Sequence, residues 1–273
     1  MQITIPSKYE GQTIEEMFKS LHLPKKELHL LRMSKEITIN DQASALRDSL
    51  SEGDKLSIPV FNETSQYVPS YRLTEVKYED EYLAIVVKPK GVKTHPNDLK
   101  EANTLMNHVI YTLDSDYAEP VHRLDQETVG LLLIAKHPIA KKILDHMLED
   151  RKITRTYKAQ VDSHLPLKPQ TIDMPIGKDK FHPNKRRVSP TGQRAITHII
   201  ESHMIDERTA AVELKLDTGR THQIRVHLTE IGHPVVGDPL YNNSKLRQLQ
   251  LHSYKIEFEH PFKDELVSVR LDD

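Results

Sequence analysis

The sequence predicts an α+β protein with two parts. Many short segments have the apolar or alternating pattern of β-strands, and few helical patterns lie between them. The first 60 residues form a separate, smaller pattern of two helices followed by two strands. Of the 273 residues, 37% are hydrophobic and 29% are charged, so a packed core is available to one large domain, or to a small and a medium one.

Composition excludes several classes of protein. No apolar run approaches the roughly 18 residues of a membrane span, and the first residues have no secretory-signal pattern. The absence of cysteine excludes disulfides, thiolate nucleophiles and Cys-based zinc sites, and it fits a reducing cytosol. The net charge of −2 excludes a wholly basic nucleic-acid-binding coat but allows a local basic face.

The small N-terminal unit, residues 1–60, is predicted from periodicity and turn signals. A Leu-Pro pair separates two segments with apolar residues at helical spacing, and a Gly-Asp turn precedes a closing strand. Its helices are expected at residues 13–21 and 25–33, and its strands at residues 36–41 and 55–60. The polar residues 61–71, which include a proline, are predicted to be a linker to residues 72–273.

Residues 72–273 contain most of the strand patterns. Apolar runs or alternation predict strands at residues 83–87, 131–135, 154–161, 195–200, 209–216, 249–259 and 265–271. Helical spacing predicts helices at residues 104–113 and 138–148. Thr221 as an N-cap and Gly232 as the C′ residue bracket a further helix of about three turns.

Residues 176–195 form the most basic segment, with Asp179 as its single acidic residue. Two prolines and a glycine predict a long loop or a hairpin arm, and loops of this length are usually functional or mobile. The positive charge suits a phosphate backbone, with Lys185, Arg186 and Arg187 as candidate contacts. A solvated arm without a ligand is the alternative interpretation.

The segment Val121–Gly130, with the sequence VHRLDQETVG, is the strongest candidate site. The apolar run after it predicts a buried strand. An Asp, an Arg and a His lie within four residues at the edge of that strand, where a carboxylate is held rigidly and still reaches a cleft. The pattern fits either a functional site or a salt-bridged turn.

Known cofactor and nucleophile motifs are missing from the sequence. It lacks the glycine-rich phosphate-binding patterns and the G-x-S-x-G elbow. His222 and His227 are five positions apart, which does not place both on one helical face, so we expect no metal site. A kinase catalytic loop is rejected because its Asn position is Gly130. A carboxylate, arginines and a tyrosine remain, which can work without a cofactor.

VHRLDQETVG is similar to the H-R-L-D-x-x-T-S-G motif of the RluA/RluD-type pseudouridine synthases. Four further segments agree with that family in order and spacing: VVKPKGVKTHP at 86–96, RTYKAQV at 155–161, LDTGRTHQIRVHL at 216–228 and GHPVVGDPLY at 232–241. LQLHSYKIEFEHP at 249–261 resembles the closing strand of the family, so the resemblance covers residues 72–273. Val129 departs from the usual Ser, and we expect altered local hydrogen bonding but not lost activity.

The resemblance implies cofactor-free isomerisation of a uridine in rRNA or tRNA. The N-glycosidic bond breaks, the uracil rotates, and a C–C bond forms from carbon 5. Asp125 matches the catalytic Asp, acting as a nucleophile or as the base that removes a ribose proton. Tyr157 matches the tyrosine that stacks on the target base, with a possible second role at the carbon-5 proton. Arg225 matches the arginine that pairs with the Asp.

The resemblance also implies roles for residues around these three. Arg123 matches the residue that fills the gap left by the flipped nucleotide, and His122 is assigned with it to RNA binding and base flipping, as part of the scaffold that aims the loop. Arg220 and His222 are expected nearby, where they orient a phosphate or the helix end. Lys88 supports a strand end or is a solvated turn lysine.

The implied fold is a mixed, mostly antiparallel β-sheet with flanking helices and a central cleft. The N-terminal unit, with INDQ and LSEGDKLSI, resembles the small RNA-binding module first known from the fourth small-subunit ribosomal protein; a structural subdomain is the alternative. We expect a cytoplasmic monomer whose partner is RNA, with no membrane association. Two other functions stay open: a non-catalytic RNA-binding or ribosome-assembly protein with this fold, and a carboxylate-dependent hydrolase using Glu127.

Overall fold

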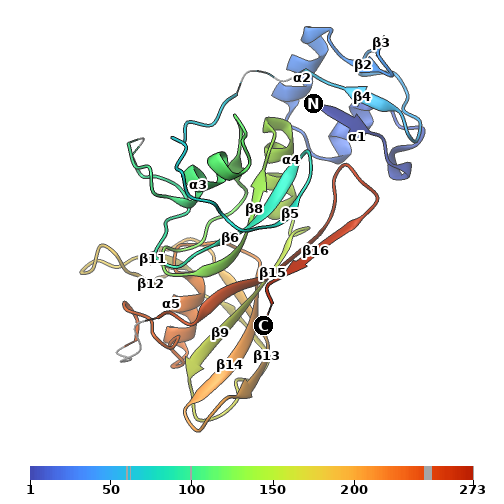
Figure 1. Ribbon diagram of the computed structural model, residues 1–273. Coiled ribbons are helices and arrows are strands. Elements are labelled where there is room, and N and C mark those ends of the chain that lie inside the picture. Colours follow the sequence, from blue (N-terminus) through green and yellow to red (C-terminus); the bar gives the residue numbers. More distant parts are fainter. Residues whose placement is uncertain (60, 62, 99, 243–247, 273) are drawn as a thin grey trace.

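The structure is a computed structural model and describes residues 1–273 except residues 60, 62, 99, 243–247 and 273. The described chain forms a small N-terminal module and a larger module built around one long, twisted sheet (Figure 1). The model is mixed α+β and its strand pairs are mostly antiparallel, as predicted.

The N-terminal module is a four-stranded sheet with two helices. Its strand order is β1-β4-β2-β3, all pairs antiparallel. In chain order its elements are β1 (Gln2–Thr4), a 3-10 turn (Ser7–Tyr9), α1 (Ile14–Ser20), α2 (Lys25–Ser34), β2 (Thr38–Ile39), β3 (Gln42–Ala43) and β4 (Lys55–Ser57). The helices begin where expected, α1 because Thr13 and Glu16 form a reciprocal capping box.

The strands of this module differ from the prediction. The strand expected at 36–41 is the shorter β2, and β3, which follows it, was not predicted. A strand at the extreme N-terminus, β1, was not predicted, because three residues are too few to show an alternating pattern; it is defined by pairing with β4. The predicted strand at 55–60 ends earlier, at Ser57, and its last residue lies outside the described residues.

The large sheet has the order β10-β13-β14-β9-β15-β8-β6-β5, with β16 paired to β15 and β7 paired to β8. Its strands are β5 (Val76–Glu79), β6 (Leu83–Lys88), β7 (Glu119–Pro120), β8 (Val129–Ala135), β9 (Thr154–Asp162), β10 (Gln170–Asp173), β13 (Ile196–Met204), β14 (Thr209–Leu216), β15 (Leu251–Glu259) and β16 (Leu266–Arg270). Within the described chain, β8 and β15 form a parallel pair, whereas the other pairs are antiparallel. This pair lies in the middle of the sheet.

Two apolar clusters, each of which includes helices, cover the two faces of the sheet. One core cluster joins α4 (Pro138–Glu149) and the N-terminal module to side chains such as Leu131 and Leu133 of β8. The other joins α3 (Leu105–Thr112) and α5 (Gln223–Glu230) to Leu132 and Ile134. Successive residues of β8 therefore enter opposite cores, which is why this strand is a continuous apolar run.

The helix predicted from Thr221 to Gly232 is shorter than expected and is capped differently. α5 has eight residues, and its N-cap is His222 in the left-handed conformation, φ +59°, not Thr221. Gly232 follows the C-cap with φ +85°, as expected for a C′ glycine. The left-handed His222 turns the chain sharply before the helix, which brings its imidazole toward the loop that precedes β8.

The basic segment at 176–195 contains a hairpin, as the composition indicated. β11 (Ile176–Lys178) and β12 (Arg186–Val188) pair outside the large sheet and project beside α5 (Figure 1). Arg187 and the intervening Phe181 are exposed, and Phe181 is 87% exposed.

Candidate active site

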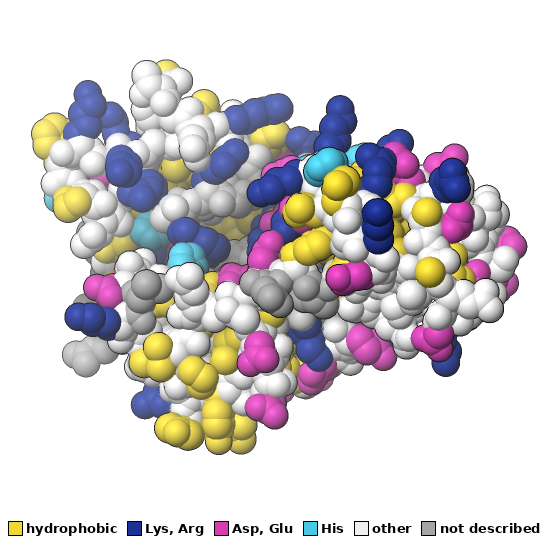
Figure 2. Space-filling model, turned by 90° about the horizontal axis from the view of Figure 1, so that it is seen from above, with side chains coloured by type: hydrophobic (Ala, Val, Ile, Leu, Met, Phe, Trp, Pro, Cys, Tyr) yellow, Lys and Arg dark blue, Asp and Glu magenta, His cyan; other side chains and the backbone are white. Residues whose placement is uncertain are grey.

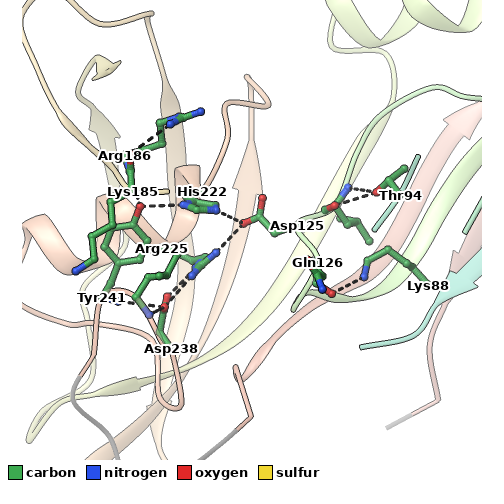
Figure 3. Close-up of polar contacts among 12 residues, drawn as sticks. Lys88, Thr94, Asp125, Gln126, Lys185, Arg186, His222, Arg225, Asp238 and Tyr241 are labelled. Atoms are coloured by element: carbon green, nitrogen blue, oxygen red, sulfur yellow. Dashed lines mark hydrogen bonds and ion pairs between the residues drawn. The ribbon is translucent and has the colours of Figure 1, made fainter. Parts of the chain in front are cut away.

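Asp125 lies in the loop immediately before β8, and a second loop clasps it. The Thr94 hydroxyl donates to the Leu124 carbonyl at 2.9 Å and accepts from the Leu124 N–H at 3.1 Å (Figure 3). One residue after Asp125, the Gln126 carbonyl accepts from the Gly91 N–H at 2.9 Å. The backbone on both sides of Asp125 is thus held by residues 91–94, which gives its carboxylate a defined direction.

Lys88 ends β6 and holds the same loop from inside the protein. Its ammonium donates to the carbonyls of Pro89, Val92 and Gln126 at 2.9, 2.7 and 2.9 Å. The side chain is fully buried, and burial lowers the pKa of Lys88 to about 8. Because all three donor positions are used by the loop backbone, the geometry favours support of the strand end over a solvated turn lysine.

Arg225 of α5 joins Asp125 to a second, buried carboxylate. Its Nη1 donates to Asp125 Oδ2 at 3.2 Å, while Nε and Nη2 donate to the two oxygens of Asp238 at 2.7 and 2.8 Å (Figure 3). The side chains of Arg225 and Asp238 are 3% and 0% exposed, whereas that of Asp125 is 21% exposed. Burial would lower the pKa of Arg225, but the hydrogen bond to Asp238 raises it overall, so the guanidinium stays charged beside Asp125.

His222 and Tyr241 complete this side of the site. The imidazole Nε2 of His222 lies 4.0 Å from Asp125 Oδ2, and its Nδ1 is 2.9 Å from the Tyr241 hydroxyl. Burial lowers the pKa of His222, and the nearby Asp125 carboxylate acts in the opposite direction. A neutral imidazole at this place can exchange hydrogen bonds with a substrate without adding charge.

Tyr157 of β9 forms the opposite wall. It is 4% exposed and lines the pocket together with Asp125 and Arg225. Burial raises the pKa of Tyr157, opposed by the charge of Arg155. The phenol therefore stays protonated near neutral pH, and its ring face is the apolar surface available to a base. Tyr157 pairs across the sheet with Ser253 of β15, whose hydroxyl donates to the Leu131 carbonyl at 2.9 Å.

Two adjoining hollows surround these groups. The one at Asp125, Tyr157 and Arg225 has a volume of about 60 Å³. The neighbouring one has a volume of about 460 Å³ and shares Arg123, Arg155 and the turn at residues 219–220 with the first. The small hollow alone is below the ~300 Å³ typical of ligand sites, so a nucleotide-sized ligand would occupy both.

The remaining predicted residues divide between the rim and the interior. Arg123 and Arg220 are exposed at the shared rim of the two hollows. His122 is 6% exposed, and its Nε2 accepts the Leu133 N–H at 3.3 Å, which places it in the scaffold of the loop. Val129 is the half-buried first residue of β8 and pairs with His252.

The basic hairpin meets the site through Tyr241. The Arg186 N–H donates to the Tyr241 hydroxyl at 2.7 Å, and the Lys185 ammonium lies 5.8 Å from the centre of the Tyr241 ring. Arg187 is exposed on the same hairpin. The structure thus connects the hairpin to His222, whereas the sequence separates them by more than thirty residues.

Sequence reasoning missed several residues that shape the site. Asp238 lies in the segment GHPVVGDPLY, but the sequence assigned it no role, because no neighbouring residue indicated that it is buried and pairs with Arg225. Gln223 was also missed: its side chain binds the Arg220 N–H at 3.0 Å, the Thr218 hydroxyl at 2.7 Å and the Ile196 carbonyl at 2.9 Å, which fixes the turn before α5. Thr94, Ser253 and Arg155 belong to the same class, since only tertiary contacts give them a position at the site.

Among the described residues, one group of potential metal ligands lies elsewhere: Asp80, His260 and Glu265. The Lys263 ammonium is 2.8 Å from Asp80 Oδ2 and His260 Nε2 is 2.9 Å from it. A lysine already supplies the positive charge, so this cluster is an ion-pair network at the base of the β15–β16 turn. Within the described part of the chain, no helix is both long and apolar enough to cross a membrane.

Comparison with known proteins gives a consistent result. Residues 82–230 match the family model of RNA pseudouridylate synthase, and residues 1–56 match that of the RluD ribosomal pseudouridine synthase N-terminal domain. An uncharacterized RNA pseudouridine synthase of Bacillus subtilis, YhcT, is 39% identical over 98% of this chain and 91% of its own length. The ribosomal large subunit pseudouridine synthase D of Neisseria meningitidis serogroup A is 32% identical over 97% of this chain and 77% of its own.

A solved structure agrees with these sequence matches. The human RNA pseudouridylate synthase domain containing 1 superimposes with a TM-score of 0.59 at 26% identity, over 73% of this chain and 83% of that one. The matched family region contains Asp125, Tyr157 and Arg225. The chain is an isomerase that belongs to the RNA pseudouridylate synthase family.

Proposed function

We propose that this RNA pseudouridine synthase acts on uridines of ribosomal RNA, with Asp125 as the reacting carboxylate. The observation that carries the assignment of Asp125 is the chain Asp125–Arg225–Asp238, which holds one partly exposed carboxylate at a hollow walled by Tyr157. Ribosomal RNA is favoured as substrate by the names of relatives that match nearly the whole chain.

The reaction requires little from a protein beyond a placed carboxylate and a shielded base. The C1′–N1 bond of the uridine breaks and the C1′–C5 bond forms; carbon 5 loses a proton and N1 gains one, so the product is an isomer of the substrate. Asp125 acts either by bonding to the sugar or by removing a ribose proton, and both roles need its ionised form. Arg225 keeps it ionised and oriented.

Tyr157 stacks on the uracil while it turns. Its side chain is largely buried and lines the small hollow, and its hydroxyl is neutral, so the ring provides an apolar surface in an otherwise charged site. A base held only by stacking is free to rotate in its plane, whereas a base held by several hydrogen bonds is not. The carbon-5 proton leaves on this side of the site.

The other predicted residues bind and open the RNA. Arg123 and Arg220 stand at the rim, where Arg123 fills the place of the flipped nucleotide and Arg220, with His222, meets the backbone. Lys185, Arg186 and Arg187 extend this surface along the hairpin, and Figure 2 shows Lys, Arg and His side chains around a hollow on this face. Lys88 and His122 act from inside, as supports of the loop.

The whole protein is proposed to work as a cytoplasmic monomer that folds residues 1–60 against the catalytic module at residues 72–273. The N-terminal module adds a further RNA-binding surface. Its helix α2 carries Lys25, Lys26 and Arg32, which are exposed. Cationic side chains on one helix suit a phosphate backbone.

The substrate proposal is tested by deleting the gene and mapping pseudouridines with carbodiimide labelling and primer extension. Loss of one or more pseudouridines from ribosomal RNA is expected, restored by the wild-type gene. If only a pseudouridine of transfer RNA were lost, the substrate would be transfer RNA and not ribosomal RNA. An unchanged map in both kinds of RNA would contradict the proposal.

The role of Asp125 is tested with Asp125→Asn and a matched control, Glu127→Gln, which removes a neighbouring carboxylate of the same loop. Turnover is followed as tritium released from carbon 5 of labelled uridine in the RNA. Asp125→Asn should lower the rate by about 10³-fold or more while RNA affinity stays within a few-fold, because the group acts on the bond and not on docking. Glu127→Gln should keep most of the activity. Ordinary turnover by Asp125→Asn would remove Asp125 from the mechanism.

A further inference from the structure

Arg155 of β9 is a buried cation that lacks a carboxylate partner. It is 5% exposed, and its Nε has no hydrogen-bond partner. In the described parts of the chain no carboxylate oxygen lies within 4.0 Å of its guanidinium nitrogens. Burying an unpaired charge is costly, so proteins usually supply a partner. An anion that binds from outside would serve here.

The position of Arg155 shows from which side that anion would come. The residue lines both the small hollow at Asp125 and the larger hollow beside it. Its Nη1 lies under the turn at Gly219, where a β-carbon would come within 3.4 Å. The next inward-facing residue on the strand is Tyr157. Arg155 and Tyr157 therefore lie on the same face of β9, two residues apart, so Arg155 is the neighbour of the position proposed for the base.

The groups around Arg155 favour an anion over a neutral ligand. Arg123 and Arg220 lie at the same hollow and have no carboxylate partner among the described residues. The larger hollow also contains two acidic residues, but neither pairs with Arg155. Asp217 binds Arg151 at 2.9 Å and His198 at 3.0 Å, and the side chain of Glu149 is 74% exposed to solvent. The remaining charge at the floor of the hollow is positive.

We propose that Arg155 binds a phosphodiester group of the RNA next to the target uridine, with Arg123 and Arg220 above it at the rim. The proposal rests on the proposed placement of the base between Asp125 and Tyr157. A flipped uridine with its base in the 60 Å³ hollow leaves its ribose and one flanking phosphate in the 460 Å³ hollow. The Nε of this guanidinium has no hydrogen-bond partner, and a planar guanidinium is suited to binding a phosphate.

The test uses a synthetic RNA hairpin centred on the uridine identified by the deletion experiment. Affinity is measured by fluorescence anisotropy in the Asp125→Asn background, which prevents turnover. Arg155→Gln is expected to raise Kd about 10- to 100-fold. It should also reduce the slope of log affinity against log salt concentration by about one, which corresponds to the loss of one phosphate contact. Arg155→Lys should recover part of the affinity.

A matched control separates this contact from the general charge of the hollow. Arg151→Gln removes another cation of the same hollow, but one whose side chain is 54% exposed and already paired with Asp217. It should change Kd by no more than about three-fold. An equal loss in the two variants would show that only the overall field matters and would overturn the proposal.

Neutral linkages in the RNA test the contact without altering the protein. A methylphosphonate replaces, one at a time, the phosphates 5′ and 3′ of the target uridine and two distant phosphates. One flanking replacement should weaken binding to the Arg155 protein as much as Arg155→Gln does, and the two changes should not add. Additive losses at every flanking linkage would contradict the proposal. So would an unchanged Kd for Arg155→Gln together with a lower kcat in the protein that keeps Asp125, which would place Arg155 at the base.

The stability of the free protein gives an independent readout. If Arg155 awaits an anion, then Arg155→Gln should leave the melting temperature unchanged or raise it, because an unpaired buried charge is removed. A structural arginine would instead be destabilising to remove. The outcome is also distinct from failure of the proposed chemistry, because the melting temperature of Arg155→Gln is measured without RNA and does not depend on whether Asp125→Asn is inactive.

Discussion

Asp238 is the residue on which the direction of the Asp125 carboxylate depends. Its two oxygens hold Arg225 by a bidentate pair, and Oδ1 also accepts the N–H groups of Leu240 and Tyr241 at 2.9 and 3.1 Å. Arg225 can therefore present only Nη1 to Asp125. A fully buried ion pair contributes little net stability, but it gives a fixed geometry that a single exposed arginine would not.

His122 shows how strongly the interior selects a protonation state. Burial, reinforced by the charge of Arg155, lowers its pKa to about 3. The neutral ring accepts the Leu133 N–H from β8, so a proton on that nitrogen would break the contact. The loop that carries Asp125 is thus attached to its strand by an imidazole that must stay uncharged.

This predicts an acid-side loss of stability. As pH falls below about 6.5 the unfolded chain binds a proton at His122, whereas the folded protein does not until pH nears 3, so stability is lost through that window. Between pH 7 and pH 5 the wild type should lose about 2 kcal/mol relative to His122→Gln, whose side chain does not titrate. Urea unfolding at both pH values measures it, and a constant difference would contradict the prediction.

At the scale of elements, the parallel pairing of β8 with β15 places the loop that carries Asp125 beside Tyr157. His252 and Ser253 pair with Val129 and Gly130, and Ser253 pairs on its other side with Tyr157. The approach needs glycine at position 130, where φ is +125° and a β-carbon would lie 2.3 Å from the Ser253 carbonyl oxygen. The loop before β8 and Tyr157 of β9 thus lie close together because β8 and β9 pair with opposite edges of the same strand, β15.

Gly130→Ala should therefore be severe. Strain and overlap together predict a loss of about 3 kcal/mol or more in unfolding free energy. Gly91→Ala is the matched control, because Gly91 also has positive φ, +75°, but no atom within 4 Å of the added carbon; it should cost about 1–2 kcal/mol. Chemical denaturation measures the unfolding free energy of both variants. Equal losses would show that backbone strain alone, and not the close approach of β15, makes glycine necessary at position 130.

At the scale of the molecule, the two modules share one core. Ile3 and Phe18 of the N-terminal module lie in the same buried cluster as Leu131 and Phe262 of the large one. The β15–β16 turn reaches the N-terminal module (Figure 1), where the Tyr9 hydroxyl donates to the Pro261 carbonyl at 2.8 Å. Linked modules of this kind hold a fixed relative orientation.

The shared core predicts a single thermal unfolding transition, with calorimetric and van't Hoff enthalpies in agreement. Tyr9→Ala should lower its midpoint or split it, since the change removes a buried ring and a hydrogen bond from the contact. Met33→Ala, on the 62% exposed Met33 of the same module, should leave it nearly unchanged. Two resolved transitions in the unaltered protein would refute the shared core.

The sequence by itself determined most of the elements and the family. The helices at α1 to α4 and most strands follow from periodicity, caps and apolar runs, which are local properties, and the five ordered motifs carry the family. The tiny β1 and the left-handed N-cap at His222 were not predictable, because pairing and turn geometry depend on distant partners.

Only the tertiary structure decided which charges meet. Asp238 was one acidic residue among 40 Asp and Glu, and Arg155 one cation among 38 Lys and Arg, until folding buried one with a partner and the other without. Burial and pairing are properties of long-range packing, and no local pattern encodes them. That is why Asp125 was recognisable from its motif, whereas the residue that aims its arginine and the cation proposed to hold the RNA were not.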